Sequence, residues 1–154
     1  MAVELFNSTQ ILAVGAASKN VIEDYAKLRM SFFDVVPTVT GDANSTADLI
    51  VLPPGRVRVL PHLSKLWNGI FGASRLIDVG YRAFEKELGA IEAEDLNDLA
   101  VGIDVSAAAN NVAFGTARKY DFFSRRGVTI SAQCRGGTWP SGISLNGYVA
   151  YLVE

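Results

Sequence analysis

The sequence has little of the residue types on which catalysis and metal binding most often depend. Its 154 residues include one cysteine, Cys134, and one histidine, His62. A lone cysteine excludes an intrachain disulfide and a multi-cysteine metal site, and a lone histidine excludes a histidine-based metal site. We interpret Cys134 as a half-buried strand residue and His62 as a partly buried structural one, since no G-x-S-x-G nucleophile turn accompanies it. We therefore expect no enzyme, no catalytic or metal-binding residue and no cofactor.

An excess of charge of one sign is also lacking. Lys and Arg number 14 against 16 Asp and Glu, which gives a formal net charge of -2. This balance argues against a protein that neutralises phosphates along nucleic acid. Apolar runs such as residues 11–17 are far shorter than the roughly 20 residues of a membrane-spanning helix. The N-terminus MAVELFNSTQ lacks the basic start of a signal peptide. We expect neither nucleic acid nor membrane as a partner, and no secretion.

What is present is apolar sequence in short, turn-separated segments. The stretch LIVLPPGRVRVL predicts a strand at residues 49–52, a stiff Pro53-Pro54-Gly55 turn and a second strand over about residues 56–66. Further strands are expected at residues 74–84, 111–116, 119–123, 127–135 and 144–153. Seven or eight such strands predict a mainly β chain, folded as a β-sandwich or jelly-roll-like domain over residues 47–154.

The first 46 residues read differently and are expected to form an N-terminal arm with a short helix and a linker. Val21, Ile22, Tyr25 and Leu28 have the spacing of one helix face. The linker follows around Pro37, in a run of Gly, Asp, Asn, Ser and Thr. Strands at residues 11–14 and 35–39 are the alternative.

Two charged segments are expected to be exposed to solvent or to contact neighbouring subunits. The acidic residues 85–98 lack the ligand spacing of a calcium loop, so we expect a solvated loop with a short helix near residues 93–99. The loop could also face a basic neighbour in an assembly. Arg118, Lys119, Arg125 and Arg126 form a small basic cluster, which predicts a solvated or intersubunit salt-bridge surface.

Four segments in order carry a family resemblance: LPPGRVRVL, RLIDVGYRA, DLAVGIDVSAA and the closing GVTISAQCRGGTWPSGISLNGYVAYLVE. Over residues 49–154 the chain resembles the head decoration, or capsid cement, proteins of tailed bacteriophages. The resemblance implies a structural virion protein, made in the host cytoplasm, that binds the outside of the capsid. Its implied partners are the major capsid protein and other copies of itself, as a dimer or trimer.

Apolar residues of the arm and loops are the candidates for partner binding. They are Leu5, Phe6, Ile11, Leu12, Val14, Phe32, Phe33, Trp67, Phe71 and Trp139. Trp139 lies on a Gly/Pro-rich loop and either anchors a partner or folds back over the sandwich.

Two other functions stay open. One is a tail-tube, head–tail connector or fibre-base protein of the virion. The other is a carbohydrate-binding module, in which Trp139 with Tyr148 or Tyr151 would form the sugar platform.

Overall fold

The computed structural model describes residues 2–4, 27–115 and 121–154, and of residues 2–4, 110 and 111 it describes the backbone only. The described residues form strands and no helix, so the chain is mainly β as predicted. Among them there is accordingly no helix that could cross a membrane. The strands are β1 (Ala2–Glu4), β2 (Lys27–Val35), β3 (Gly41–Ala43), β4 (Thr46–Leu52), β5 (Gly55–Val59), β6 (Lys65–Asn68), β7 (Leu76–Tyr81), β8 (Phe84–Glu85), β9 (Ile91–Glu92), β10 (Asp95–Asp104), β11 (Ala109–Ala113), β12 (Asp121–Ser124), β13 (Val128–Arg135), β14 (Thr138–Trp139) and β15 (Leu145–Val153).

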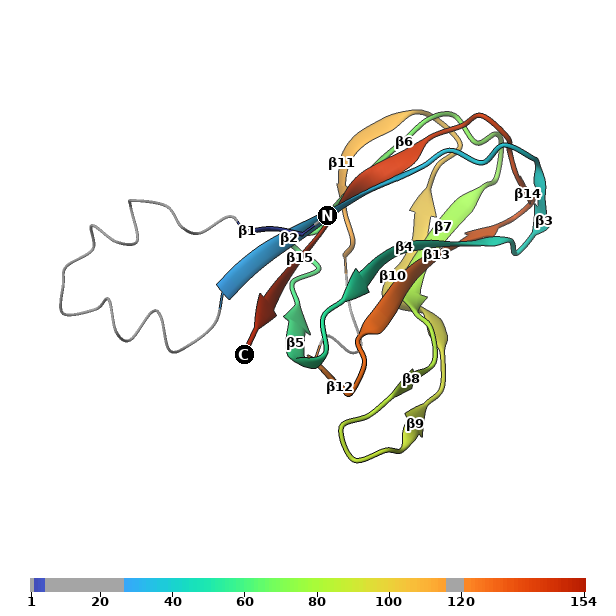
Figure 1. The fold of residues 1–154 in the computed structure, drawn as a ribbon. Helices are drawn as coiled ribbons and strands as arrows, with labels where there is room; N and C mark the ends of the chain where they lie inside the picture. The colour runs from blue at the N-terminus through green and yellow to red at the C-terminus, as the bar shows by residue number, and fades with distance from the viewer. Residues whose placement is uncertain (1, 5–26, 116–120) are drawn as a thin grey trace, which may run out of the picture.

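Two antiparallel sheets make up the sandwich (Figure 1). The larger sheet has the order β1-β2-β15-β5-β12, and β6 and β11 extend it beside the first half of β15. The smaller sheet has the order β10-β7-β13-β4. Two short pairs, β3–β14 and β8–β9, lie at the ends, and the β8–β9 hairpin projects beyond the sheets.

Strand β15 organises the larger sheet. All nine of its residues pair with β2, from Leu145 opposite Val35 to Val153 opposite Lys27. On its other side it pairs first with β6 and then with β5. The single strand predicted over residues 56–66 is therefore two strands. A turn at Pro61 separates them, because proline cannot donate to a strand ladder, and the Ser64 amide closes that turn on the Leu60 carbonyl at 3.0 Å.

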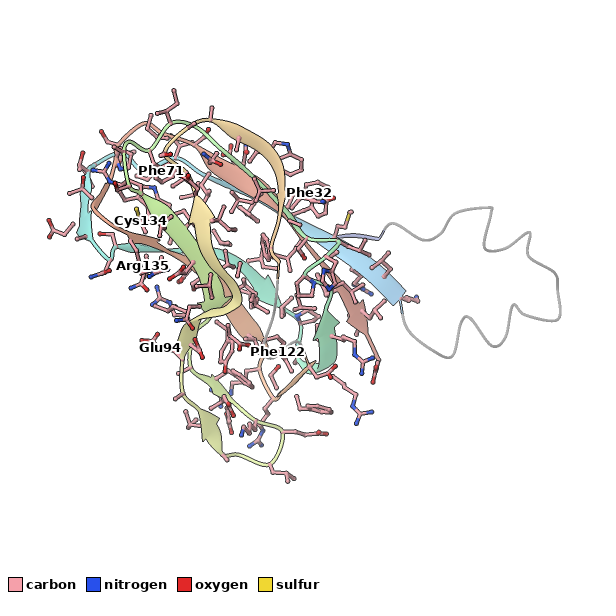
Figure 2. The ribbon with its side chains drawn as sticks, turned by 180° about the vertical axis from the view of Figure 1, so that it is seen from behind. Phe32, Phe71, Glu94, Phe122, Cys134 and Arg135 are labelled. Carbon is pink, nitrogen blue, oxygen red and sulfur yellow. The ribbon has the colours of Figure 1, made fainter. Side chains whose placement is uncertain are left out.

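The core lies between the two sheets and is closed by aromatic residues. Phe71 and Cys134 lie toward one end of the sandwich and Phe122 toward the β8–β9 end (Figure 2). Cys134 is completely buried on β13, more so than the half-buried position predicted. His62 is exposed in the turn before β6, so its prediction as a partly buried residue was wrong.

The predicted helices need correction where they fall on described residues. Val21, Ile22 and Tyr25 lie outside the described part, but Leu28 belongs to β2. Nine continuous pairings with β15 explain why tertiary contact overrides a helical pattern there.

The second predicted helix, at residues 93–99, is replaced by the start of strand β10. Gly80 on β7 allows this arrangement, since a Cβ at Gly80 would lie 1.9 Å from the Asp95 carbonyl oxygen. The bulge of β10, between its Asp95–Tyr81 and Ala100–Val79 pairs, can approach β7 this closely only because no side chain stands at position 80.

Strand pairing also begins earlier than the expected domain boundary. The sheets include β2 and β3, which precede residue 47, where the sequence analysis placed the start of the sandwich. Strand β3 pairs with β14 at the end of the closing hairpin loop. Within residues 27–46, β2, β3 and the first residue of β4 are thus paired with other strands.

Candidate functional site

A groove lies over β2, β6 and β15 on the outer side of the larger sheet. Register sets two rows of residues across these three strands. Tyr148 lies opposite Phe32 on β2 and Lys65 on β6, while Asn146 lies opposite Asp34 and Trp67. Directly paired residues share one face of a sheet, so aromatic and polar side chains alternate over this surface. The groove has a volume of about 580 Å³ and is lined by Phe32, Phe33, Asp34, Trp67, Asn68, Gly69, Ser144, Asn146 and Gly147.

Three aromatic rings form a continuous contact beside the groove. The Tyr148 ring centroid lies 5.5 Å from that of Phe32 and 5.7 Å from that of Trp67, with tilted planes. These spacings fall in the range that aromatic pairs prefer, so the rings hold one another in place. Phe32 remains 48% exposed, and Trp67 and Tyr148 are half-buried. The result is a fixed aromatic surface that solvent can reach.

Asn68 supplies the buried polar group of the groove. Its Nδ2 donates to the Gly69 carbonyl at 2.7 Å and to the Ala107 carbonyl at 2.8 Å. These two bonds fix the orientation of the amide, because only the NH₂ side can donate to both carbonyls. Its Oδ1 is buried and accepts no hydrogen bond from any described residue. Such an acceptor costs about 1–3 kcal/mol when no donor reaches it.

A second surface of interest is the β8–β9 hairpin, whose tip is apolar. Leu88 is 97% exposed and Ile91 is 69% exposed. Gly89 takes a positive φ of 88° in the turn, a conformation that glycine adopts without steric cost. Isolated apolar residues on a surface are common, but an apolar tip on a projecting element is typical of a contact with another molecule.

Aromatic packing and backbone bonds anchor the hairpin base. Phe84, Tyr81 and Phe122 form an edge-to-face cluster with ring centroids 5.2 to 5.8 Å apart. The Arg125 amide donates to the Glu85 carbonyl at 3.0 Å, which ties β8 to the end of β12. The hairpin therefore projects from the sandwich as a supported element.

Ion pairs surround this base and account for much of the charge noted in the sequence. Glu85 pairs with Arg125 at 3.2 Å and with Arg126 at 3.5 Å, and Lys86 pairs with Glu92. Glu94, farther along, pairs with Arg82 at 3.5 Å. Glu85, Glu92 and Glu94 of the acidic segment and the two arginines are thus matched within the chain. The other two residues of the predicted basic cluster, Arg118 and Lys119, lie outside the described residues. Burial, and then the nearby carboxylates of Asp98, Glu92 and Asp95, raise the pKa of Tyr81 to about 12.

The predicted partner-binding residues fall into three groups. Leu5, Phe6, Ile11, Leu12 and Val14 lie outside the described residues. Phe33, Phe71 and Trp139 belong to the core instead of forming an accessible partner surface. Phe32 and Trp67 are accessible, and the structure brings them together beside Tyr148.

The predicted sugar platform on Trp139 is not formed. Trp139 is 2% exposed and packs on Phe71 at 5.8 Å between ring centroids, and Tyr151 is buried as well. Of the two loop conformations considered, the one folded over the sandwich is therefore found. Only Tyr148 of that predicted platform faces the groove surface.

Sequence reasoning missed Asn68, Asn146 and Asp34 at the groove and Leu88 at the hairpin tip. The three polar residues carry no sequence signal of their own, because the register of β15 against β2 and β6 brings them together. For Leu88 a signal existed, since ELGA reads as a turn within alternating residues.

The chain matches no family model, and no curated protein matches its sequence. A chain in a solved structure described as "Cyanophage Pam1 capsid asymmetric unit" superposes with a TM-score of 0.52. The two chains are 13% identical, and the match covers 84% of this chain and 86% of that chain. What they share is the fold. The likeness extends over most of both chains, so it concerns the sandwich as a whole and not a local motif.

Proposed function

We propose that this chain is a structural virion protein, which binds the outside of a tailed-phage capsid and stabilises contacts between major capsid subunits. It acts by binding alone, without catalysis or a cofactor. The fold shared with a chain of a cyanophage capsid asymmetric unit supports a place in the virion. The ordered segments of residues 49–154, which resemble capsid cement proteins, support the external position.

The projecting β8–β9 hairpin is the observation that carries the binding role. Leu88 at its tip buries nothing within its own chain, while the Tyr81–Phe84–Phe122 cluster supports its base. A supported apolar tip loses little conformational entropy when it enters a pocket of a neighbouring subunit. On a symmetric shell many such contacts act together, so a weak single contact suffices.

The direct test is co-sedimentation with capsid shells of the parent phage that lack this protein. Saturable binding at a fixed ratio to the major subunit, with shells that resist heat and low salt better, is the expected result. Absence of binding at every stage of shell expansion would refute the decoration role and favour a tail or connector protein.

Matched variants identify the contact. The double substitution Leu88→Ser and Ile91→Ser should weaken shell binding at least tenfold and leave the melting temperature nearly unchanged, because both side chains are exposed. Val39→Ser is the control, since Val39 is 73% exposed and lies away from the hairpin. Equal loss of binding in the control would show that the hairpin is not the specific contact.

A second part of the proposal concerns the arm and self-association. Leu5, Phe6, Ile11, Leu12 and Val14 would add apolar contact with a neighbouring subunit, and copies would associate as dimers or trimers. Because β2 begins at Lys27 and pairs along its whole length with β15, a truncation should stop before Lys27. The truncated chain should fold and should bind shells less tightly. Sedimentation velocity of the full chain alone should show a discrete dimer or trimer, and a strict monomer would contradict that part.

A further inference from the structure

The groove over β2, β6 and β15 has a chemistry that the hairpin contact does not use. Strand β6, which contributes Trp67 to the groove, lies at the opposite end of the sandwich from the β8–β9 hairpin (Figure 1). We propose that this groove binds a neutral saccharide, with Phe32 and Trp67 as the stacking surface and Asn146 and Asp34 as hydrogen-bonding groups.

The aromatic part suits one face of a sugar ring. A pyranose carries C–H groups on its flat faces and hydroxyls around its rim, so it packs on an aromatic ring while its rim stays polar. Phe32, 48% exposed and held by Tyr148, offers such a surface on β2. Trp67, held by the other side of Tyr148, offers a second one on β6. In Figure 2 the Phe32 side chain lies at the edge of the molecule, on β2.

The polar part suits the rim. Asp34 and Asn146 lie opposite each other on β2 and β15, and Ser144 lines the same groove. A carboxylate accepts from two neighbouring hydroxyls, while an amide both donates and accepts. These side chains stand within the same rows as the aromatic rings, as recognition of an amphipathic ring requires.

Asn68 supports the floor of the groove. Along β6 its side chain alternates with that of Trp67, and it is 6% exposed. Its Nδ2 donates to the Gly69 and Ala107 carbonyls, which ties the end of β6 to the segment before β11. The groups that can contact a ligand are therefore those of the outer face, Phe32, Asp34, Trp67 and Asn146.

Charge and size narrow the ligand class. Among the described residues that line the groove Asp34 is the one charged residue, and Lys65 lies in the neighbouring row, opposite Tyr148. One charge of each sign on this face gives no excess that would attract an acidic or a basic sugar, so a neutral saccharide is favoured. The volume of about 580 Å³ lies within the range of about 300–1,000 Å³ typical of ligand sites and leaves room for more than one sugar ring.

The test begins with a glycan array of neutral and acidic oligosaccharides, followed by titration of the best neutral hit. Trp67 serves as the reporter, since the chain has two tryptophans and Trp139 is buried. A saturable change in tryptophan fluorescence is expected, together with saturation transfer from protein to sugar C–H protons in NMR. Absence of saturable binding across the array would overturn the proposal, and so would preference for acidic glycans.

Single substitutions distinguish sugar binding at the groove from binding of the capsid shell there. Phe32→Ala and Asn146→Ala should each weaken binding of the titrated sugar at least tenfold. Phe123→Ala is the control, because Phe123 is a 38% exposed aromatic of the same sheet, on β12 outside the groove. Undiminished binding by Phe32→Ala would overturn the assignment. Loss of shell binding by Phe32→Ala, without any glycan binding by the unmodified chain, would assign the groove to the capsid and also overturn it.

Discussion

The hydroxyl of Tyr81 lies beneath the projecting hairpin, where burial and nearby carboxylates raise its pKa to about 12. In an unfolded chain a tyrosine ionises near pH 10. Between these two values the unfolded chain releases a proton that the folded chain retains, so the free energy of unfolding should fall as pH rises from about 10 to about 12. Below pH 10 this contribution is constant.

Denaturant titrations across that pH range, for the unmodified chain and for Tyr81→Phe, measure the effect. Tyr81→Phe should show a shallower decline of the free energy of unfolding, since the titrating group is gone and the ring remains. An identical decline in both proteins would contradict the assignment to Tyr81.

The Cys134 thiol should react only slowly with thiol reagents in the folded protein. Its side chain is fully buried, and burial raises the pKa of its thiol although the nearby Arg75 opposes that shift. Both properties suppress the thiolate that reacts with disulfide reagents. Reaction with Ellman's reagent at neutral pH should therefore be slow in buffer and rapid after denaturation, and rapid reaction in buffer would show that β13 opens easily.

At the level of elements, the close approach of the β10 bulge to β7 depends on Gly80. An added Cβ would meet the backbone of Asp95 and Leu96, which cannot move aside as a flexible side chain could. Gly80→Ala should therefore lower the free energy of unfolding by about 1–3 kcal/mol or more. Gly89→Ala, which meets open space at a positive φ, should cost only about 1–2 kcal/mol. Denaturant unfolding ranks the two variants, and the reverse order would contradict the close packing of the β10 bulge on Gly80.

The hairpin should depend more on its aromatic base than on its ion pairs. Phe84→Ala removes a buried ring from the cluster with Tyr81 and Phe122 and should cost about 3–5 kcal/mol. Glu85→Gln removes pairs with Arg125 and Arg126, whose side chains are largely exposed, and should cost at most about 1 kcal/mol. Thermal unfolding of both variants checks the difference, and a larger loss for Glu85→Gln would mean that the charges hold the hairpin.

An element could be predicted from the sequence where its conformation depends on residues close together in the chain. It could not be predicted where its conformation depends on pairing with a distant strand. Strands β4, β13 and β15 were predicted because their apolar residues and flanking turns are continuous in sequence. Residues 93–99 were predicted as helix because Ala93, Glu94 and Leu96 permit one locally. Residues 95–99 instead begin β10, as a bulge between the Asp95–Tyr81 and Ala100–Val79 pairs, and no local pattern reveals this long-range pairing.

The groove also could not be predicted, because it is formed by residues from strands that are distant in sequence. Phe32 and Trp67 were singled out as large aromatic residues, yet nothing in the sequence placed them on one surface. Tyr148 joins them only because β15 pairs with β2 on one side and with β6 on the other. The orientation of Asn68 depends on a hydrogen bond from its Nδ2 to the carbonyl of Ala107, which is distant in sequence.

For the molecule as a whole, the groove and the hairpin should act independently. They involve different strands, and β6 of the groove lies at the opposite end of the sandwich from β8 and β9 (Figure 1). Substitutions at distant sites without shared partners usually have additive effects. A chain with Leu88→Ser and Phe32→Ala should lose shell binding and sugar binding as far as each single variant does, in the same two assays. Loss of both activities in either single variant would show that the two surfaces are coupled.

The position of β15 also bears on the timing of synthesis. β2 leaves the ribosome early, but its neighbour along its whole length is β15, which follows only after almost all the other strands. The smaller sheet, from β4 to β13, can form while translation continues. The larger sheet cannot close before residues 145–153 emerge, because β5 and β6 also pair with them. A nascent chain therefore has no complete groove, and the edge of β2 that pairs with β15 stays open until residues 145–153 have left the ribosome.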